Sequence, residues 1–330
     1  MKQLLNRLIN HETIDKEEAK QVLVNISKGD YNQSQIASFL TVYMMRSITI
    51  EELEGFRDAL LELCVAVDLN EYNPIDLCGT GGDGKDTFNI STLSSFITAG
   101  AGVKVTKHGN YGVSSTCGSS NVMEFLGIKF SNDKEFLKRS MDKAGICVLH
   151  APLFHPAMKN VAPIRRELGV KTFFNMLGPM VNPAFPKNQM VGVFNLELAR
   201  MYGYLYQNTD KNFTIVHALD GYDEISLTGS TKTISNHTEG MLTPQDFGVP
   251  VLQMEDIAGG TTIEASAGIF LNILEGKGTE AQNNVVCANA GIAIATVEGL
   301  TPKQGFEKAK ESLLSGKGLK ALQRVQELSR

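Results

Sequence analysis

The sequence contains no long uninterrupted apolar segment. None of its stretches reaches the roughly 18 consecutive apolar residues that a membrane-spanning helix requires. The first twenty residues are amphipathic, and their charges come too often for the apolar middle of a secretion signal. With 330 residues, 42% of them hydrophobic and 20% charged, the chain has the composition of a globular protein of one or two domains. We expect a cytoplasmic protein with no membrane partner.

The sequence also lacks an excess of positive charge and any cysteine motif. Its 36 acidic and 31 basic side chains give a net charge of -5, which disfavours nucleic acid held by a broad basic surface. There is no Cys-x-x-Cys pair and no histidine at the spacing of zinc ligands, so we expect reduced thiols in packing roles. The five cysteines are Cys64, Cys78, Cys117, Cys147 and Cys287.

The first seventy residues show the patterns of helices only. Asp15 followed by Glu18, and Thr49 followed by Glu52, have the spacing of capping boxes, in which side chains satisfy otherwise unpaired backbone N–H groups. Gly29 is predicted to end a helix. Apolar residues at three- and four-residue spacing predict two amphipathic helices. They are Ile36, Phe39, Leu40, Tyr43 and Met44 in one, and Leu53, Phe56, Leu60, Leu61 and Cys64 in the other.

From residue 73 onward, short strands alternate with glycine-rich loops and helices. The apolar run at 75–78 leads into a glycine-rich loop and then into a helical pattern that begins near Asn89 or Ser91. Two further units follow, strand 103–105 with loop 107–119 and strand 213–216 with loop 220–224. This alternation predicts an α/β domain with a largely parallel sheet and crossover helices. Ligands of such sheets bind beyond the carboxyl ends of the strands, where the three loops would meet.

The first of these loops, residues 79–86, reads GTGGDGKD and is open to three interpretations. As G-x-G-x-x-G it lacks the acidic residue that a dinucleotide site needs about 20 positions later. As G-x-x-x-x-G-K it has Asp86 where a P-loop has a hydroxyl for magnesium, and a carboxylate there would repel a phosphate. The third interpretation is that the glycine backbone N–H groups converge on an anion beside the positive end of the next helix. The alternative to these three binding functions is a tight turn that has no ligand.

The second loop and an acidic pair extend the phosphate-binding interpretation. Lys107 provides a cation at the end of a strand, followed by glycines, an amide and hydroxyls, which suits a second phosphate or ribose contact. His108 fits a general acid, a ligand contact or a packed imidazole equally well. Asp223 and Glu224 suit magnesium, which prefers oxygen ligands and bridges to substrate phosphate. Without a ligand, Lys107 would be a surface charge and the acidic pair a solvated turn.

These segments resemble the anthranilate phosphoribosyltransferase family, which belongs to the nucleoside phosphorylase-like superfamily. The resemblance spans nearly the whole chain, and a chance match to all its motifs in order is implausible. The motifs are 78–83 (CGTGGD), 88–92 (FNIST), 107–110 (KHGN) with Ser114 and Ser115, 155–159 (HPAMK) through 165–169 (RRELG), 175–179 (NMLGP) and 220–226 (DGYDEIS).

The resemblance implies a magnesium-dependent transferase of L-tryptophan biosynthesis. It would move the 5-phosphoribosyl group of phosphoribosyl diphosphate to the amine of anthranilate, giving N-(5-phosphoribosyl)anthranilate and diphosphate. The implied phosphoribosyl diphosphate contacts are Gly79, Gly82, Asp83, Thr87, Asn89, Ser91, Thr92, Lys107, Ser115 and Ser119. The implied magnesium contacts are Ser91, Asp223 and Glu224, and the implied anthranilate contacts are Gly79, Asn110 and Arg165. The aromatic amine is a neutral nucleophile, so we assign no general base, and Lys107 would stabilise the departing diphosphate.

The resemblance also implies a layout of two domains. A small all-helical domain, residues 1–72 plus about 163–185, would be hinged to a larger α/β domain, residues 73–162 plus 186–330. The helical domain would form a homodimer and carry the acceptor side of the site. There the cationic fork of Arg165 suits the carboxylate of anthranilate, and domain closure would bring the two substrates together. The alternative is that Arg165, beside Arg166, is a surface arginine.

Four positions depart from the usual pattern of this family. Tyr111 and Gly112 stand where Arg-Ala is commoner, Thr116 replaces a frequent lysine, and Phe154 occupies a position that is often histidine. Loss of a cation at position 111 would weaken a contact to substrate or to a neighbouring loop, and Phe154 would alter the access path of the aromatic acceptor. None of these positions is assigned to the metal or to diphosphate, so the expected function is unchanged.

Two other functions stay open at this point. A pyrimidine nucleoside phosphorylase-like enzyme would share the superfamily fold and a related glycine loop, but it would use inorganic phosphate and need no divalent-metal pair. A non-enzymatic relative would bind nucleic acid through a basic surface, which the net charge of -5 opposes. A strict magnesium requirement would separate the transferase from the phosphorylase, and salt-sensitive binding of single-stranded DNA would reveal the third possibility.

Overall fold

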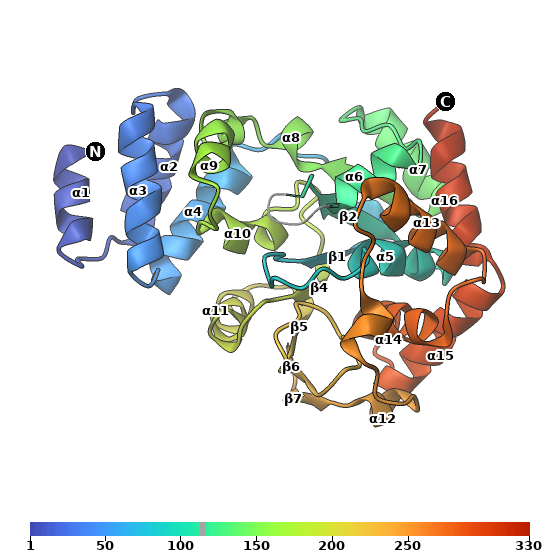
Figure 1. Ribbon diagram of the computed structural model, residues 1–330. Helices are drawn as coiled ribbons and strands as arrows, with labels where there is room; N and C mark the ends of the chain where they lie inside the picture. Colours follow the sequence, from blue (N-terminus) through green and yellow to red (C-terminus); the bar gives the residue numbers. More distant parts are fainter. Residues whose placement is uncertain (113–116) are drawn as a thin grey trace. The chain divides into compact units, whose positions relative to one another are not determined.

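The computed structural model describes residues 1–112 and 117–330, and the chain divides into two compact units (Figure 1). The first unit comprises Met1–Val67 and Ala151–Pro183, and the second comprises Asp68–His150 and Ala184–Arg330. The first unit therefore takes in residues 151–162, which the sequence analysis assigned to the α/β domain. A physical reason is that the side-chain amide of Asn160 donates hydrogen bonds to the carbonyls of Ile26 and Ser27.

The first unit contains helices only. Its elements are α1 (Lys2–Ile9), α2 (Lys16–Lys28), α3 (Gln33–Met45), α4 (Ile50–Glu62), α8 (Ala151–Phe154), η2 (Pro156–Asn160), α9 (Ala162–Leu168), α10 (Phe174–Leu177) and η3 (Gly178–Met180). The predicted helix ends are confirmed: Asp15 caps α2, Thr49 and Glu52 form a complete capping box at α4, and Gly29 ends α2 with a left-handed φ of 82°. The predicted apolar faces meet in an aromatic cluster of Phe39, Tyr43, Phe56 and Phe173.

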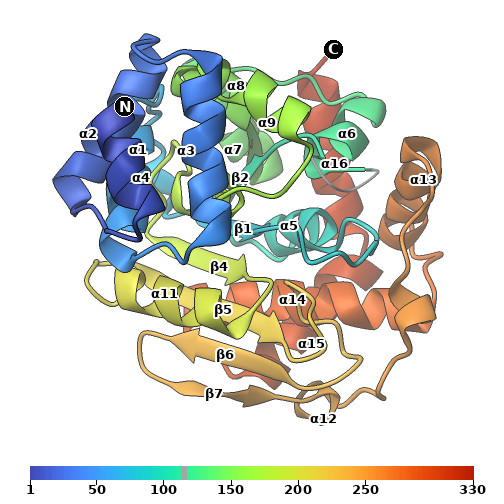
Figure 2. The ribbon, with the colours of Figure 1, turned by 60° about the vertical axis from the view of Figure 1, so that its left-hand side comes forward.

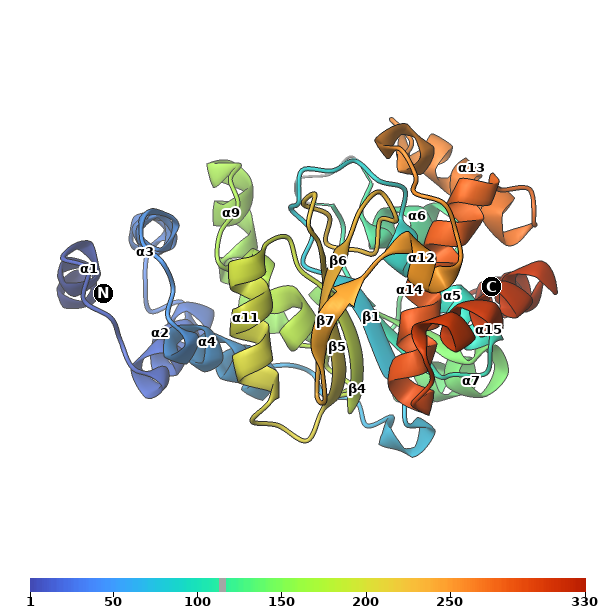
Figure 3. The same cartoon turned by 90° about the horizontal axis from the view of Figure 1, so that it is seen from below.

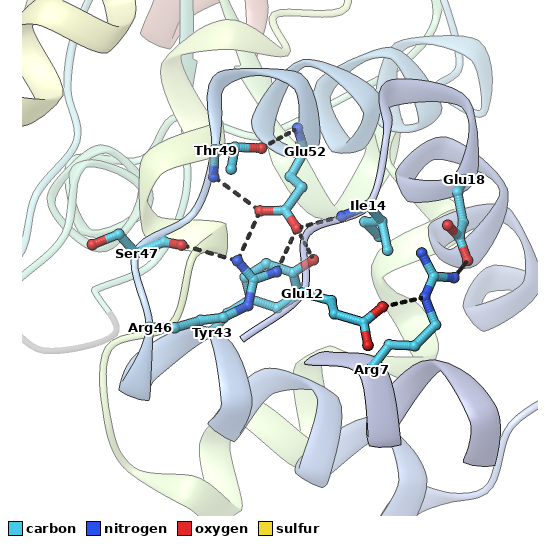
Figure 4. A network of polar contacts seen from close by, with 9 residues as sticks. All are labelled: Arg7, Glu12, Ile14, Glu18, Tyr43, Arg46, Ser47, Thr49 and Glu52. Atoms are coloured by element: carbon cyan, nitrogen blue, oxygen red, sulfur yellow. Dashed lines mark hydrogen bonds and ion pairs between the residues drawn. The ribbon is translucent and has the colours of Figure 1, made fainter. Parts of the chain in front are cut away.

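A buried carboxylate ties together the segments around α3 and α4 (Figure 4). Glu52 is fully buried and accepts hydrogen bonds from the Ile14 N–H at 3.2 Å, the Tyr43 hydroxyl at 3.1 Å and the Thr49 N–H at 2.9 Å. The guanidinium of Arg46, whose side chain is 6% exposed, pairs with the same carboxylate. One side chain thus satisfies donors from the loop before α2, the end of α3 and the start of α4.

The second unit is built on one seven-stranded sheet. Its strands are β1 (Ile75–Gly79), β2 (Val105–Gly109), β3 (Ile146–His150), β4 (Asn188–Gly192), β5 (Asn212–Ala218), β6 (Thr231–Ser235) and β7 (Glu239–Leu242). The strand order is β3-β2-β1-β4-β5-β6-β7, with parallel pairing from β3 to β5 and antiparallel pairing from β5 to β7. The predicted fold class, a helical domain with a larger α/β domain around a mostly parallel sheet, is confirmed.

Helices cover both faces of this sheet (Figures 2 and 3). One face carries α11, and the other carries α5 and α14, with α15 and α16 packed outside them. The helical elements of the unit are η1 (Asn70–Tyr72), α5 (Ile90–Gly100), α6 (Ser119–Phe125), α7 (Lys134–Ala144), α11 (Leu196–Tyr206), α12 (Pro244–Phe247), η4 (Met254–Ile257), α13 (Ile263–Leu274), α14 (Glu280–Glu298), α15 (Pro302–Leu314) and α16 (Lys317–Leu328). Buried apolar side chains of β1, α5 and α14 form a large part of the main hydrophobic core.

Across the described part of the chain, no single helix has the length and apolar character needed to cross a membrane, and only α14 and α15, joined at a bend of 116°, meet that requirement as a pair.

The second strand begins and ends later than the sequence analysis placed it. The apolar residues 103–105 predicted a short strand there, whereas β2 runs from Val105 to Gly109. Lys107 and His108 are therefore strand residues, paired in register with Val148 and Leu149 of β3, and not part of the following loop. Their polar side chains concealed the strand because half-buried strands are recognised by apolar alternation.

Candidate active site

Asp223 lies close to the carboxyl ends of β1 and β4. A Cβ atom on Gly79 would lie 2.3 Å from the Asp223 carboxylate, and one on Gly192 would lie 1.5 Å from the Asp223 carbonyl oxygen. A larger residue at Gly79 would displace the Asp223 side chain, and one at Gly192 would displace the Asp223 backbone. The glycines of the site therefore serve close approach of one loop to two strands.

The glycine-rich loop after β1 turns back toward the same carboxylate. Gly81, Gly82 and Gly84 all adopt left-handed backbone angles, with φ between 65° and 75°. The Gly81 N–H donates a hydrogen bond of 2.6 Å to Oδ2 of Asp223. Asp83 accepts from the Lys85 N–H at 3.0 Å, which tightens the turn. The loop thus directs the Gly81 N–H to a carboxylate of the protein itself, and the third interpretation, binding of a phosphate by several N–H groups, stays a prediction.

Asp223 and Glu224 form a buried acidic pair. Burial, together with the neighbouring charge of Asp83, raises the pKa of Asp223 to about 7. Burial and the charge of Asp223 raise the pKa of Glu224 well above its usual range. Oε2 of Glu224 is buried without a hydrogen-bond partner among the described residues, although the Ser91 backbone N–H bonds to this carboxylate. The raised pKa values show that burial disfavours the ionised forms of both carboxyl groups.

A small cavity lies against this pair. It is lined by Leu77, Cys78, Ser91, Ser94, Met190, Gly192, Val216, Asp223, Glu224 and Asn289. The structure thus brings the three predicted magnesium contacts, Ser91, Asp223 and Glu224, to one place. Within the described residues, no group of three or more His, Cys, Asp and Glu side chains could hold a metal. Magnesium in proteins commonly has one or two carboxylates and completes its shell with water and substrate phosphates, so two carboxylates and a hydroxyl suit it.

The start of α5 forms the next part of the site. Asn89 is the N-cap residue of α5, but its side chain does not cap the helix and donates instead to the Cys117 carbonyl at 3.0 Å. This hydrogen bond links the first loop to the segment that precedes α6. Thr87 forms an isolated antiparallel bridge with Ala258, and Thr92 is buried in the first turn of α5. The predicted helix start near Asn89 is confirmed, and its first turn adjoins Glu224 through Ser91.

Strand β2 carries a cation, and the segment after it carries an amide. Lys107 is 3% exposed, its Nζ donates to the His108 carbonyl at 3.1 Å, and its charge lowers the pKa of Glu224 against the effect of burial. Asn110 is exposed, and its carbonyl accepts from Oγ of Ser119 at 3.2 Å. Ser114, Ser115 and Thr116, which the sequence analysis also named, lie outside the described residues.

Arg165 belongs to the first unit, on α9. One terminal nitrogen of its guanidinium donates to Oδ1 of Asn175 at 3.1 Å, and the guanidinium carbon lies 5.3 Å from the centre of the Phe174 ring. Burial lowers its pKa from the usual value, and its Nε is buried without a hydrogen-bond partner among the described residues. The guanidinium is therefore a positioned group with unused donor capacity, unlike a solvated surface arginine.

Three features of the site were missed by the sequence analysis. Asn289 of α14 accepts from the Ile225 N–H at 3.0 Å and donates to the Ile225 carbonyl at 2.9 Å, which anchors the acidic loop. Lys85 lies over the ring of Tyr222, 4.7 Å from its centre, and so joins the glycine loop to the acidic loop. The Gly259 N–H donates to the Asp86 carbonyl at 2.6 Å. The one available signal was Asn289, an amide within the otherwise apolar stretch 285–295 of α14.

Two models of one protein family match the chain. The helical bundle domain of the glycosyl transferase family matches residues 2–64, and its a/b domain matches residues 71–319. The first range lies within the first unit, and the second range covers most of the second unit together with residues 151–183 of the first. The first sixty residues and the sheet domain are therefore both accounted for by one family.

Full-length relatives carry the same name. Anthranilate phosphoribosyltransferases of Flavobacterium psychrophilum and Flavobacterium johnsoniae are 77% and 74% identical, with complete coverage of both chains. The crystal structure of the Thermus thermophilus anthranilate phosphoribosyltransferase matches with a TM-score of 0.91 and 31% identity, covering 99% of each chain. The Saccharomyces cerevisiae enzyme in complex with PRPP and Mg matches with a TM-score of 0.90 and 27% identity, covering 98% of this chain and 96% of that one. By family models, sequence and fold, the chain belongs to the anthranilate phosphoribosyltransferases of the glycosyl transferase family.

Proposed function

We propose that the protein transfers the 5-phosphoribosyl group of phosphoribosyl diphosphate to the amine of anthranilate, in L-tryptophan biosynthesis. The bond from ribose C1 to the diphosphate oxygen breaks with its electron pair on diphosphate, the bond from C1 to the amine nitrogen forms, and the amine proton passes to water. The observation that carries the proposal is the buried Asp223–Glu224 pair beside the glycine loop and the first turn of α5. The 77% identity to a full-length relative of this name supports the same reaction.

Magnesium is the proposed cofactor, held by Ser91, Asp223 and Glu224. When bound, it would neutralise negative charge on the departing diphosphate. The fit rests on the donor set: all three residues line one cavity, and Oε2 of Glu224 is buried without a partner in the described structure. A cation there would stabilise the ionised forms that burial disfavours, so both carboxyl groups would lose their raised pKa values.

The phosphoribosyl diphosphate contacts that we propose come from three segments of the second unit. The glycine loop and the start of α5 would offer backbone N–H groups and short polar side chains to phosphate oxygens. Lys107 would take up charge on the leaving group, and its burial within β2 would strengthen that interaction. The residues are Gly79, Gly82, Asp83, Thr87, Asn89, Ser91, Thr92, Lys107, Ser115 and Ser119, of which Ser115 lies outside the described residues.

The anthranilate contacts that we propose are Gly79, Asn110 and Arg165. Arg165 supplies a cation for the carboxylate of anthranilate, and its Nε is free to donate among the described residues. No general base is proposed, because the aromatic amine attacks in its neutral form. A homodimer through the helical bundle and a cytoplasmic location belong to the same proposal, and they rest on the resemblance and on the composition.

Mass spectrometry of the reaction products tests the proposed function directly. We expect the purified protein, with anthranilate, phosphoribosyl diphosphate and magnesium, to form a product with the mass of phosphoribosyl anthranilate. A parallel mixture of thymidine and inorganic phosphate without magnesium should give no thymine. Release of thymine, with no new anthranilate product, would contradict the proposal and favour a nucleoside phosphorylase.

A further inference from the structure

A cluster of side chains outside the proposed contacts holds the segment that follows β2. The edge of the Tyr111 ring meets His150, with 4.8 Å between ring centres and 74° between planes. Phe130 stacks on the same imidazole at 4.4 Å and 17°, and Oγ of Ser120 lies 2.9 Å from its Nδ1. We call Tyr111, Glu124, Phe130 and His150 the Tyr111 cluster. His150 is thus fixed on several sides and offers Tyr111 a rigid surface.

The hydroxyl of Tyr111 has a separate partner. It lies 3.3 Å from each carboxylate oxygen of Glu124, a residue of α6. His150 is the last residue of β3, so the Tyr111 side chain connects the segment after β2 to a neighbouring strand and to a helix. The Tyr111 side chain is 39% exposed, which is more than a ring that fills the core would be. Its contacts are therefore better suited to holding its own backbone in place than to stabilising the whole fold.

The backbone on either side of Tyr111 lies outside the helices and strands. Asn110 precedes it and lies in neither strand nor helix. Oδ1 of Asn110 accepts from the Tyr111 N–H at 2.8 Å, and the Asn110 carbonyl accepts from the Ser120 N–H at 3.1 Å. On the other side, the Gly112 N–H donates to Oδ1 of Asn121 at 3.0 Å. The position of Asn110 thus depends on hydrogen bonds that flank Tyr111.

We propose that Tyr111 is a positioning residue for anthranilate: its ring, held by His150 and Glu124, fixes the backbone that carries Asn110. The inference rests on the proposed function, in which Asn110 contacts anthranilate. Lys107 and Ser119, assigned to phosphoribosyl diphosphate, are held by β2 and by α6. In the described part of the chain, no hydrogen bond or ring contact joins Lys107 to Tyr111, and Ser119 keeps its place in α6 although its Oγ also donates to the Asn110 carbonyl. Loss of the ring should therefore act mainly on the anthranilate end of the reaction.

Steady-state kinetics of two variants separates positioning from a general structural effect. Tyr111→Ala should raise the KM for anthranilate about tenfold, the scale of a lost aromatic pair, and leave the KM for phosphoribosyl diphosphate within about twofold. Tyr111→Phe keeps the ring against His150 and should restore most of the anthranilate KM. The matched control is Tyr204→Ala, which removes an exposed tyrosine from α11. Equal increases in both KM values, or none, would overturn the inference.

Amide hydrogen exchange provides a readout that does not require turnover. The Ser120 N–H, bonded to the Asn110 carbonyl, should exchange faster in Tyr111→Ala than in the wild type or Tyr111→Phe. Unchanged exchange overturns the inference whether or not the enzyme is active. If the wild type shows no turnover, the proposed function has failed, and equilibrium binding of anthranilate, followed by its fluorescence, replaces the KM. Weaker binding by Tyr111→Ala alone then supports the inference, and equal or absent binding overturns it.

Discussion

At the scale of single residues, the site depends on side chains that are absent as much as on those that are present. Gly79 and Gly192 leave room for Asp223 at the ends of two strands, and the Gly81 N–H is aimed at its carboxylate. With Glu224 beside it, Asp223 concentrates negative charge where burial opposes it. Such a pair gains most from a cation, and this is the physical basis for assigning magnesium to these residues.

Arg165 gives a prediction at the same scale. Arg165→Ala should raise the KM for anthranilate at least about tenfold and change the KM for phosphoribosyl diphosphate far less, because a charge-assisted contact to the carboxylate is lost. Arg165→Lys keeps the charge without the forked guanidinium, so its KM for anthranilate should lie between those of the wild type and Arg165→Ala. Both constants come from initial rates at varied concentrations of each substrate.

The control for this prediction is the neighbouring arginine. Arg166→Ala removes an exposed cation from the same helix and should leave both KM values near those of the wild type. If Arg165→Ala raises both KM values equally, its hydrogen bond to Asn175 serves the structure of the helical unit, and the anthranilate assignment is wrong.

At the scale of elements, two kinds of organisation place these residues. In the second unit, the parallel strands β1, β2 and β4 end at one edge of the sheet, so the loops that follow them gather there. In the first unit, the helices α3 and α4 are held at their ends by Glu52, whose carboxylate accepts from backbone and side chains alike (Figure 4). Residues that follow the carboxyl ends of the strands form the proposed active site, and the Glu52 carboxylate stabilises the helical unit.

The stability of the helical unit should depend on this carboxylate. Glu52→Gln preserves the shape of the side chain but leaves Arg46, 6% exposed, without its counter-charge, so we expect a loss of about 3 kcal/mol in the free energy of unfolding. Urea unfolding followed by circular dichroism measures it. Glu51→Gln, an exposed carboxylate in the same first turn, should change stability by less than about 0.5 kcal/mol. Similar effects of the two variants would show that the buried pair contributes little.

Features decided by neighbouring residues were predictable from sequence, whereas features decided by distant contacts were not. Asp15, Gly29 and Thr49 mark helix ends because their partners lie within five residues. Lys107 was placed in a loop because its strand is recognisable only from pairing with β3, about forty positions away. Asn289 was missed because its partner, Ile225, lies 64 residues earlier in the chain. The glycine loop and the acidic pair were found as separate motifs, and the fold shows that they touch.

At the scale of the whole molecule, the proposed reaction draws on residues of both units. The acidic pair, the glycine loop and Lys107 belong to the second unit, and Arg165 belongs to the first. The two models of the same family together match residues of both units, and relatives such as the Flavobacterium psychrophilum enzyme match the chain over its whole length. Neither part alone contains all the proposed contacts, so the intact chain is the unit to assay.

The most direct test of the account is the decay of anthranilate fluorescence with phosphoribosyl diphosphate and the intact protein. We predict a decay that requires magnesium, stops with EDTA and resumes when magnesium is restored. The rate of this decay should be at least about a hundredfold lower in the double variant Asp223→Asn, Glu224→Gln. Circular dichroism confirms that the variant is folded. Decay that persists in EDTA, or at wild-type rate in the folded double variant, would contradict the assignment of magnesium-assisted phosphoribosyl transfer to this acidic pair.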